Sequence, residues 1–256
     1  MRFLTITDLE GVAGIDSFSQ TRTQDLSVKA PGMKQLAREA SACARGIMNV
    51  LPNAMVDIWD GHGGGAIDQS ELTCGTYIGH HNQPYWDMSS YDGLLFVGQH
   101  AMVGSINAPL CHTYSSLNVA YYRLNGVYMG EFSCLALIAG LQGVPAVFLS
   151  GDDKACLEAC MFVPNIVTVA VKKGIGVEAA IHMNNDEACT AISAGAARAV
   201  RKIAEIAPFN SIKPPFIFEA RNNDPVDKTA LIKRGYTIID ERTFQLKTDD
   251  IRQLPF

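Results

Sequence analysis

The chain has 256 residues, 48% of them hydrophobic and only 18% charged, and its formal net charge is −5. This acidic balance and the absence of any run of Lys or Arg argue against a nucleic-acid partner, because binding to phosphate groups requires clustered basic side chains. So small a charged fraction also leaves less polar surface than a typical monomer carries, which predicts a homo-oligomer with apolar surface buried between its subunits.

The sequence predicts neither a membrane segment nor an export signal. Asp8 and Glu10 come too early for the apolar core of a signal peptide, and no run reaches the ~18 apolar residues that span a bilayer. The 7 cysteines are odd in number and dispersed, which favours free thiols over a disulfide framework. We therefore expect a cytoplasmic protein with no membrane partner.

Patterns typical of strands and helices alternate along residues 1–207, which predicts an α/β domain with a mostly parallel sheet flanked by helices. Residues 1–7 predict a first strand and residues 32–50 a helix, with Pro31 near its first turn. The Asn-Gly pair at 125–126 favours a type I′ turn, so a β-hairpin is expected around it. The other elements predicted here are strands at 54–59, 93–97, 116–124, 127–129, 146–149 and 166–171, and helices at 131–141, 153–161 and 185–206.

Residues 208–256 differ in composition from the rest, being more charged and richer in proline. They predict two strands, residues 216–219 and 236–239, around a short helix at 225–233. We expect this smaller C-terminal α/β segment to pack on the same domain as residues 1–207.

Three carboxylates and two imidazoles stand near the ends of predicted strands. Asp8 and Glu10 follow the first strand at i and i+2, so both side chains leave an extended segment on the same side. His62 and His100 follow the next two strands, and Glu131 opens the helix after the hairpin. The carboxyl ends of parallel strands meet at one edge of an open sheet, and these residue types suit zinc, manganese or a similar ion. The sequence therefore predicts a site for two divalent metal ions.

Each of these residues also has a simpler interpretation. Asp8 and Glu10 are placed like acids that cap helices, and His62 is placed like a turn residue in the glycine-rich loop 61–65. An acid at the start of a helix, as at Glu131, favours the helix dipole without any ion. The shared position of all these residues at strand ends is what favours the metal site.

His112 lies in a polar loop ahead of the hairpin, where it is available as a nucleophile or general base. Its neighbour Cys111 offers a thiol nucleophile, but adjacent residues rarely face each other across a hydrogen bond. Asp152 follows a predicted strand and is expected to cap the next helix, with a supporting role at the metal site left open. His80 and His81 are interpreted as structural.

Seven short motifs in order give the chain a resemblance to the zinc D-aminopeptidases of the DppA type. The resemblance covers residues 1–206 and depends on the order and spacing of the motifs, because each motif alone is weak. The motifs are Asp8-Leu9-Glu10-Gly11, Asp60-Gly61-His62, Gly98-Gln99-His100-Ala101, His112-Thr113, Gly130-Glu131, Gly151-Asp152-Asp153 and Val171-Lys172-Lys173-Gly174.

The resemblance implies two zinc ions in each chain. It implies Asp8 as the bridging ligand, with Glu10 and His62 completing the shell of one ion. His100 and Glu131 would then complete the shell of the other ion. The resemblance also implies a homodecamer of two stacked five-membered rings with active sites facing an inner channel, which agrees with the small charged fraction.

We therefore expect a metallo-aminopeptidase that releases N-terminal residues from short peptides, with D-residues preferred and His112 as the catalytic nucleophile, as the resemblance implies. A two-metal phosphoesterase is the alternative enzyme class. Against it, no Arg or Lys lies close in sequence to the ligand motifs to clamp a phosphate, and Lys154 is the nearest candidate. A third interpretation is a non-catalytic, metal-dependent assembly protein whose ions are structural.

Overall fold

A seven-stranded sheet forms the centre of the computed structural model, which describes residues 1–256. Its strand order is β3-β2-β1-β4-β7-β8-β9, and every neighbouring pair is parallel except β8 and β9. The predicted α/β fold with a mostly parallel sheet is therefore confirmed. The strands are β1 (Arg2–Thr7), β2 (Met55–Asp60), β3 (Thr76–Ile78), β4 (Gly93–Gln99), β7 (Ala146–Asp152), β8 (Val167–Gly176) and β9 (Ala179–His182).

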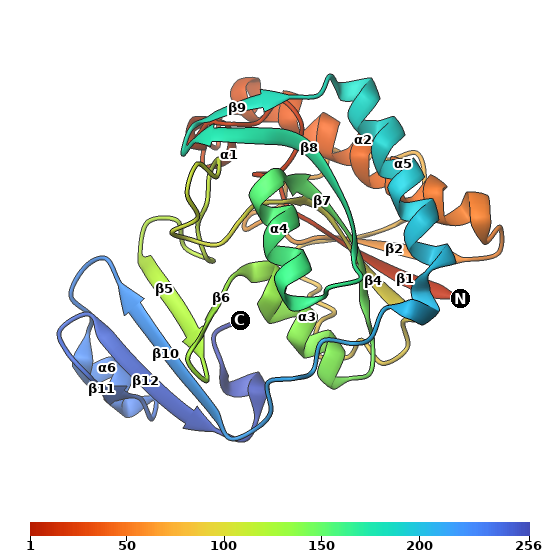
Figure 1. Ribbon diagram of the computed structural model, residues 1–256. Helices are drawn as coiled ribbons and strands as arrows, with labels where there is room; N and C mark the ends of the chain where they lie inside the picture. Colours follow the sequence, from red (N-terminus) through yellow and green to blue (C-terminus); the bar gives the residue numbers. More distant parts are fainter.

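Helices cover both faces of this sheet (Figure 1). The long helices α2 (Leu26–Val50) and α5 (Asn185–Arg201) pack along each other on one face, and α3 (Glu131–Leu141) and α4 (Asp153–Phe162) lie on the other. The middle strands are consequently buried from both sides, which explains why they read as continuous apolar runs rather than as alternating patterns.

The second sheet is antiparallel, with strand order β11-β12-β10-β5-β6, and Figure 1 shows it as a separate layer at the lower left. Three of its strands, β10, β11 and β12, come from the C-terminal segment, and Phe256 packs against Phe218 and Tyr114. The elements are β5 (Val119–Leu124), β6 (Val127–Met129), β10 (Phe216–Asn222), β11 (Thr237–Ile238) and β12 (Thr243–Thr248), with the helix α6 (Lys228–Lys233).

The hairpin β5–β6 connects the two parts of the chain. Asn125 and Gly126 have φ values of 50° and 84°, as the predicted type I′ turn requires. The Asn125 side chain accepts a hydrogen bond from the backbone N–H of Ile217 at 2.7 Å and donates to the carbonyl oxygens of Lys213 and Pro215. Strands from both sides of residue 208 therefore share one sheet, and the division into residues 1–207 and 208–256 stays a prediction.

The helix predicted at 225–233 begins three residues later, at Lys228, and the two longest predicted helices also have different bounds in the structure. α2 begins at Leu26 rather than at residue 32, because the Asp25 side chain caps it by accepting a hydrogen bond from the N–H of Ser27 at 2.9 Å. Pro31 thus lies inside the helix. α5 ends at Arg201 rather than at residue 206, and a 3₁₀ turn follows it. The strands β3, β9 and β12 were not predicted, because their partly exposed residues form no buried apolar run.

Two glycines let the ends of β1 and β4 approach each other closely. The N–H of Gly11 donates to the carbonyl oxygen of Gly98 at 2.7 Å. A Cβ on Gly98 would lie 2.0 Å from the carbonyl oxygen of Asp8, and a Cβ on Gly11 would lie 2.1 Å from that of Gln99. Gly98 also has a φ of +78°, which disfavours any L side chain. The backbone segments next to Asp8 and Gln99 are therefore in contact because both positions lack a Cβ.

Replacing Gly98 with Ala is expected to lower the free energy of unfolding by about 3 kcal/mol, because the new Cβ must displace the Asp8 backbone. Gly104→Ala is the matched control, since Gly104 has a φ of +84° and nothing within 4 Å of its Cβ position. The control should lose only about 1 to 2 kcal/mol from backbone strain. Urea unfolding measures both variants, and equal losses would show that the close approach at Gly98 is unimportant.

Candidate metal centre

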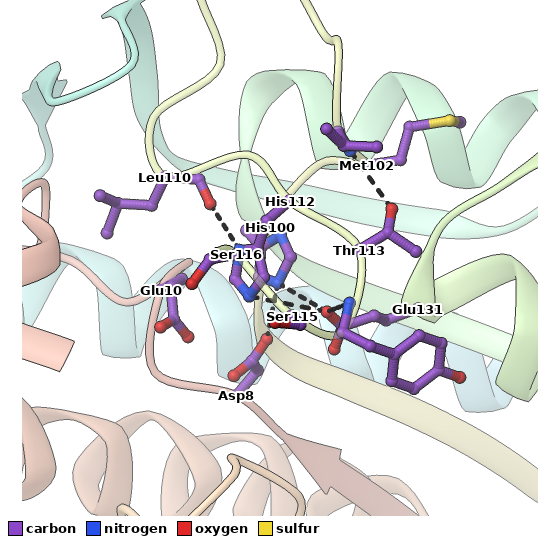
Figure 2. Close-up of polar contacts among 12 residues, drawn as sticks. Asp8, Glu10, His100, Met102, Leu110, His112, Thr113, Ser115, Ser116 and Glu131 are labelled. Atoms are coloured by element: carbon purple, nitrogen blue, oxygen red, sulfur yellow. Dashed lines mark hydrogen bonds and ion pairs between the residues drawn. The ribbon is translucent and has the colours of Figure 1, made fainter. Parts of the chain in front are cut away.

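The predicted ligands come together at the carboxyl ends of three neighbouring strands. β2, β1 and β4 lie side by side, and His62, Asp8 and His100 follow them within two residues. Glu10 lies in the loop after β1, and Glu131 comes from the first turn of α3. The structure therefore places all five predicted ligands in one cluster. Figure 2 shows four of them.

Asp8 lies at the centre of the cluster, and its two carboxylate oxygens face different partners. Oδ1 is 3.0 Å from Nδ1 of His62, which is also 3.0 Å from Oε2 of Glu10. Oδ2 is 3.2 Å from Nε2 of His100, which lies 3.4 Å from Oε1 of Glu131. The five side chains thus form two groups that meet at Asp8, which is the arrangement a carboxylate needs in order to bridge two ions.

The cluster is nearly closed to solvent and rich in charge. Asp8, Glu10 and His100 are at most 9% exposed. Burial alone favours a neutral His62, but the charges of Glu10 and Asp8 outweigh burial and raise its pKa to about 10. Burial would raise the pKa of Glu131, yet the neighbouring His100 lowers it overall. The imidazoles thus carry the positive charge that these carboxylates require, and a divalent cation would supply the same charge while releasing the protons.

Two buried atoms test whether the cluster suits a metal ion. Asp8 Oδ2 and His100 Nε2 are both buried, and although they lie 3.2 Å apart, neither makes a hydrogen bond to the other or to any other group. An unpaired buried polar atom is costly and rare in folded proteins. One ligand atom each from Asp8, Glu10 and His100 lie within 4.8 Å of one another. The residues therefore fit a metal ion as the partner that these two atoms lack.

His100 and His112 present the same ring nitrogen to the cluster (Figure 2). Nδ1 of His100 lies 2.9 Å from the carbonyl oxygen of Ala101, and Nδ1 of His112 lies 2.8 Å from that of Leu110. Because a carbonyl oxygen only accepts, Nδ1 carries the proton and Nε2 of a neutral ring has a free lone pair. The two rings stack with centroids 3.9 Å apart.

The surroundings of His112 favour its neutral form. Burial is the main cause of its lowered pKa, and the charge of His100 adds to the effect. Nε2 of His112 lies 3.7 Å from Oε1 of Glu131, which also accepts a hydrogen bond from the N–H of Tyr114 at 2.7 Å. His112 is therefore close enough to the second group of ligands to act on a substrate bound there. Cys111 is a weaker nucleophile, because burial raises the pKa of its thiol.

Buried carboxylates hold the backbone that follows His100. Asp152 caps α4, as predicted, and it also accepts a hydrogen bond from the N–H of Ala101 at 3.1 Å. Glu158 accepts one from the N–H of Met102 at 2.7 Å. These two acids fix the position of the segment that carries His100 without touching the metal centre.

Lys172 performs the corresponding task for the loop after β1. Its ammonium donates to the carbonyl oxygens of Glu10, Val12 and Ile15. Burial lowers the pKa of Lys172 to about 8. This contact gives the Val-Lys-x-Gly motif of the sequence a structural role, because it fixes the backbone of the Asp8–Glu10 segment.

The metal centre borders two small cavities that share Asp8 and Glu131 in their walls. The first has a volume of ≈ 280 Å³, and Trp59, Tyr85 and Phe256 are among its walls. The second has a volume of ≈ 270 Å³ and is polar. His80, interpreted as structural from its sequence context, also lines the first cavity.

The second cavity contains two cations that the sequence analysis did not predict. Arg22 and Lys29 line it together with four of the five predicted ligands, namely Asp8, Glu10, His62 and Glu131. No Arg or Lys lies close to the ligand motifs in sequence, but Arg22, from the segment between β1 and α2, and Lys29, from the first turn of α2, line the cavity in space. The sequence-based argument against a phosphoesterase is therefore weakened. Lys154, the candidate named from the sequence, instead pairs with Asp153 at 2.7 Å.

The fold and the cluster define an α/β protein with a candidate metal centre. The family described as D-aminopeptidase matches residues 1–255, so the chain belongs to the D-aminopeptidase family. A D-aminopeptidase of Bacillus subtilis (strain 168) is 34% identical over 87 residues, which are 34% of this chain and 31% of that protein. The aligned segment thus spans about a third of that relative.

A solved structure shares the fold. It is described as the Zn-dependent D-aminopeptidase DppA from Bacillus subtilis, a self-compartmentalizing protease. It matches with a TM-score of 0.87 over 99% of this chain and 93% of that chain, at 21% identity. The solved structure thus confirms the fold, and the match to the family model confirms the family resemblance drawn from the motifs. No helix of the protein combines the length and the apolar character needed to cross a membrane.

Proposed function

We propose that the protein is a zinc aminopeptidase that releases N-terminal residues, with D-residues preferred, from short peptides. The main observation in support is the position of Asp8, whose two oxygens face two separate groups of ligands. Glu10 and His62 would complete one ion, and His100 and Glu131 the other. Three protein ligands to each ion leave a coordination position for a substrate, as catalytic zinc sites require. The family and the zinc dependence stated for the similar structure support the choice of metal and reaction.

When bound, two zinc ions would polarise the scissile carbonyl and lower the pKa of a water molecule at the site. His112 would act at Nε2, which has a free lone pair because Nδ1 donates to Leu110. The first cavity, with Trp59 and Tyr85 in its walls, would receive the side chain of the N-terminal residue and exclude water from it.

Peptide hydrolysis tests this function directly. Dipeptides of L,L, D,D and mixed configuration should be assayed with and without added zinc, and zinc-dependent release of the N-terminal residue is expected, fastest for the D,D peptide. One observation favours the phosphoesterase alternative, namely the position of Arg22 and Lys29 beside the ligands. A p-nitrophenyl phosphate assay tests it. Binding of zinc without either activity would support a structural role for the ions.

The assignment of the metal ligands predicts the metal content of the protein. Elemental analysis of the zinc-loaded protein should find about two ions in each chain, because five ligands exceed what one tetrahedral zinc requires. His62→Ala should lower the content to about one ion, and Asp8→Ala should lower it further, since Asp8 belongs to both groups. His182→Ala is the matched control, because His182 contacts Gly14 and Asp16 outside the cluster. Unchanged zinc content in Asp8→Ala would contradict the bridging role.

Zinc content and turnover together distinguish a catalytic role of His112 from the role of a metal ligand. His112→Ala should lower kcat by about 10²-fold or more while both ions remain, because a catalytic nucleophile or general base contributes at least roughly that factor. Glu131→Ala should lower both zinc content and turnover. Ligand atoms of His100, His112 and Glu131 lie within 4.8 Å of one another, so a His112 variant that loses an ion would show that His112 is itself a ligand.

We also propose that the protein acts in the cytoplasm as a homodecamer whose sites face an inner channel. The hairpin β8–β9 supports assembly, because Ile175, Val177 and Ile181 are each at least 55% exposed, and β9 is an edge strand. The similar structure is described as self-compartmentalizing. A narrow channel would admit short peptides and exclude folded proteins.

Light scattering during size exclusion should therefore give about ten times the 27.7 kDa of one chain. Ile181→Asp should reduce this mass, because it places a charge where the apolar hairpin contacts another subunit. Ile232→Asp, at an equally exposed position on α6, serves as the control. A wild-type mass of a single chain would exclude the ring and the size filter, but it would not affect the metal centre.

A further inference from the structure

The second cavity combines the metal ligands with two positive charges that no carboxylate neutralises. Arg22 and Lys29 line it with Glu10, His62 and His112. Neither cation takes part in any ion pair of the protein. The acids of the same cavity are occupied with the imidazoles of the cluster. The cavity therefore contains two cations whose charges no side chain of the protein pairs.

Arg22 is held in place but keeps part of its guanidinium free. Nε donates to the Ser116 hydroxyl at 3.0 Å and Nη2 to the Ser116 carbonyl at 3.4 Å, while Nη1 has no protein partner. Its Cζ lies 3.5 Å from the centre of the Phe18 ring, and the edge of Phe18 packs on His112. A guanidinium fixed in this way loses little conformational entropy when it binds a carboxylate.

Lys29 is the stronger indication of a ligand, because it is buried. The side chain belongs to a residue that is 7% exposed, and its ammonium donates only to the carbonyl oxygen of Gly65 at 3.2 Å. An ammonium has three donors, and a buried charge is costly unless it is paired. Gly65 belongs to the loop that carries His62. Lys29 therefore places an incompletely satisfied positive charge beside that loop.

We propose that Arg22 and Lys29 bind the C-terminal carboxylate of a short peptide whose amino end lies at the metal centre. This inference rests on the proposed aminopeptidase function and specifies its substrate class as dipeptides and other very short peptides with a free carboxylate. The volume of ≈ 270 Å³ supports a short substrate, since drug-sized ligands occupy roughly 300 to 1,000 Å³. A peptide anchored at both ends is selected by its length as well as by its first residue.

The test compares D-alanyl-D-alanine with its C-terminal amide, which differ only in the charge that Arg22 and Lys29 would bind. The zinc-loaded wild-type protein should prefer the free acid, measured as the ratio of the two kcat/KM values. Arg22→Ala should lower this ratio by about tenfold to a hundredfold, the range for losing a hydrogen bond to a charged group. Arg22→Lys should recover part of the preference. Arg201→Ala removes an exposed arginine outside both cavities and should leave the ratio unchanged.

Binding gives a second readout that does not depend on turnover. Calorimetric titration of the zinc-loaded His112→Ala protein should show tighter binding of the acid than of the amide, and adding Arg22→Ala should abolish this difference. Equal kcat/KM values for acid and amide in the wild type would overturn the proposal while leaving the aminopeptidase function intact. An Arg22→Ala variant that slows both substrates equally would assign Arg22 a structural role through Phe18, and would also overturn it.

If the wild type hydrolyses neither peptide, the proposed function fails, and the titration still decides whether the cavity binds a carboxylate. Hydrolysis of p-nitrophenyl phosphate that is lost in Arg22→Ala would identify the bound anion as a phosphate and would contradict the proposal.

Discussion

Mutual compensation of charge around Asp8 is the constraint on which the rest of the structure depends. Asp8, Glu10 and Glu131 bring three carboxylates into a space that is nearly closed to water, where like charges repel strongly. Positive charge at the same place is needed to offset this repulsion. The imidazoles of His62 and His100 are oriented to supply that charge when protonated, or to bind metal ions that supply it. The protein must therefore hold these side chains against their own tendency to separate.

Contacts to the backbone, made by residues other than the five predicted ligands, hold these side chains together. Gly11 and Gly98 bring the segments beside Asp8 and Gln99 into direct contact. The ammonium of Lys172 fixes the loop after β1, while Asp152 and Glu158 fix the segment after His100. Burying these charged side chains costs desolvation free energy. Charged donors and acceptors nevertheless make stronger hydrogen bonds to the backbone than neutral ones do. The candidate metal centre is thus held in place by charged hydrogen bonds as well as by packing.

The sequence predicted the parts of the site that follow from local pattern. A ligand placed directly after a buried parallel strand must reach the carboxyl edge of the sheet, so Asp8, His62 and His100 could be grouped before the fold was known. The start of α2 was misplaced because Pro31 resembles a helix start, whereas the cap at Asp25 determines it. Pairing of β5 with β10 could not be predicted, since it joins segments far apart in the chain and has no local signal. The position of Arg22 and Lys29 beside the ligands also has no local signal in the sequence, so it could not be predicted either.

The two cavities differ in charge, and this difference would fix the orientation of a bound peptide. One cavity has aromatic walls and the other has two cations, and both meet at Asp8 and Glu131. A peptide with one apolar end and one anionic end can occupy both only in a single orientation, because reversing it would place a carboxylate against Trp59 and Tyr85. The two cations that weaken a sequence-based argument against phosphate chemistry would therefore, under the proposed function, orient a short peptide in the site.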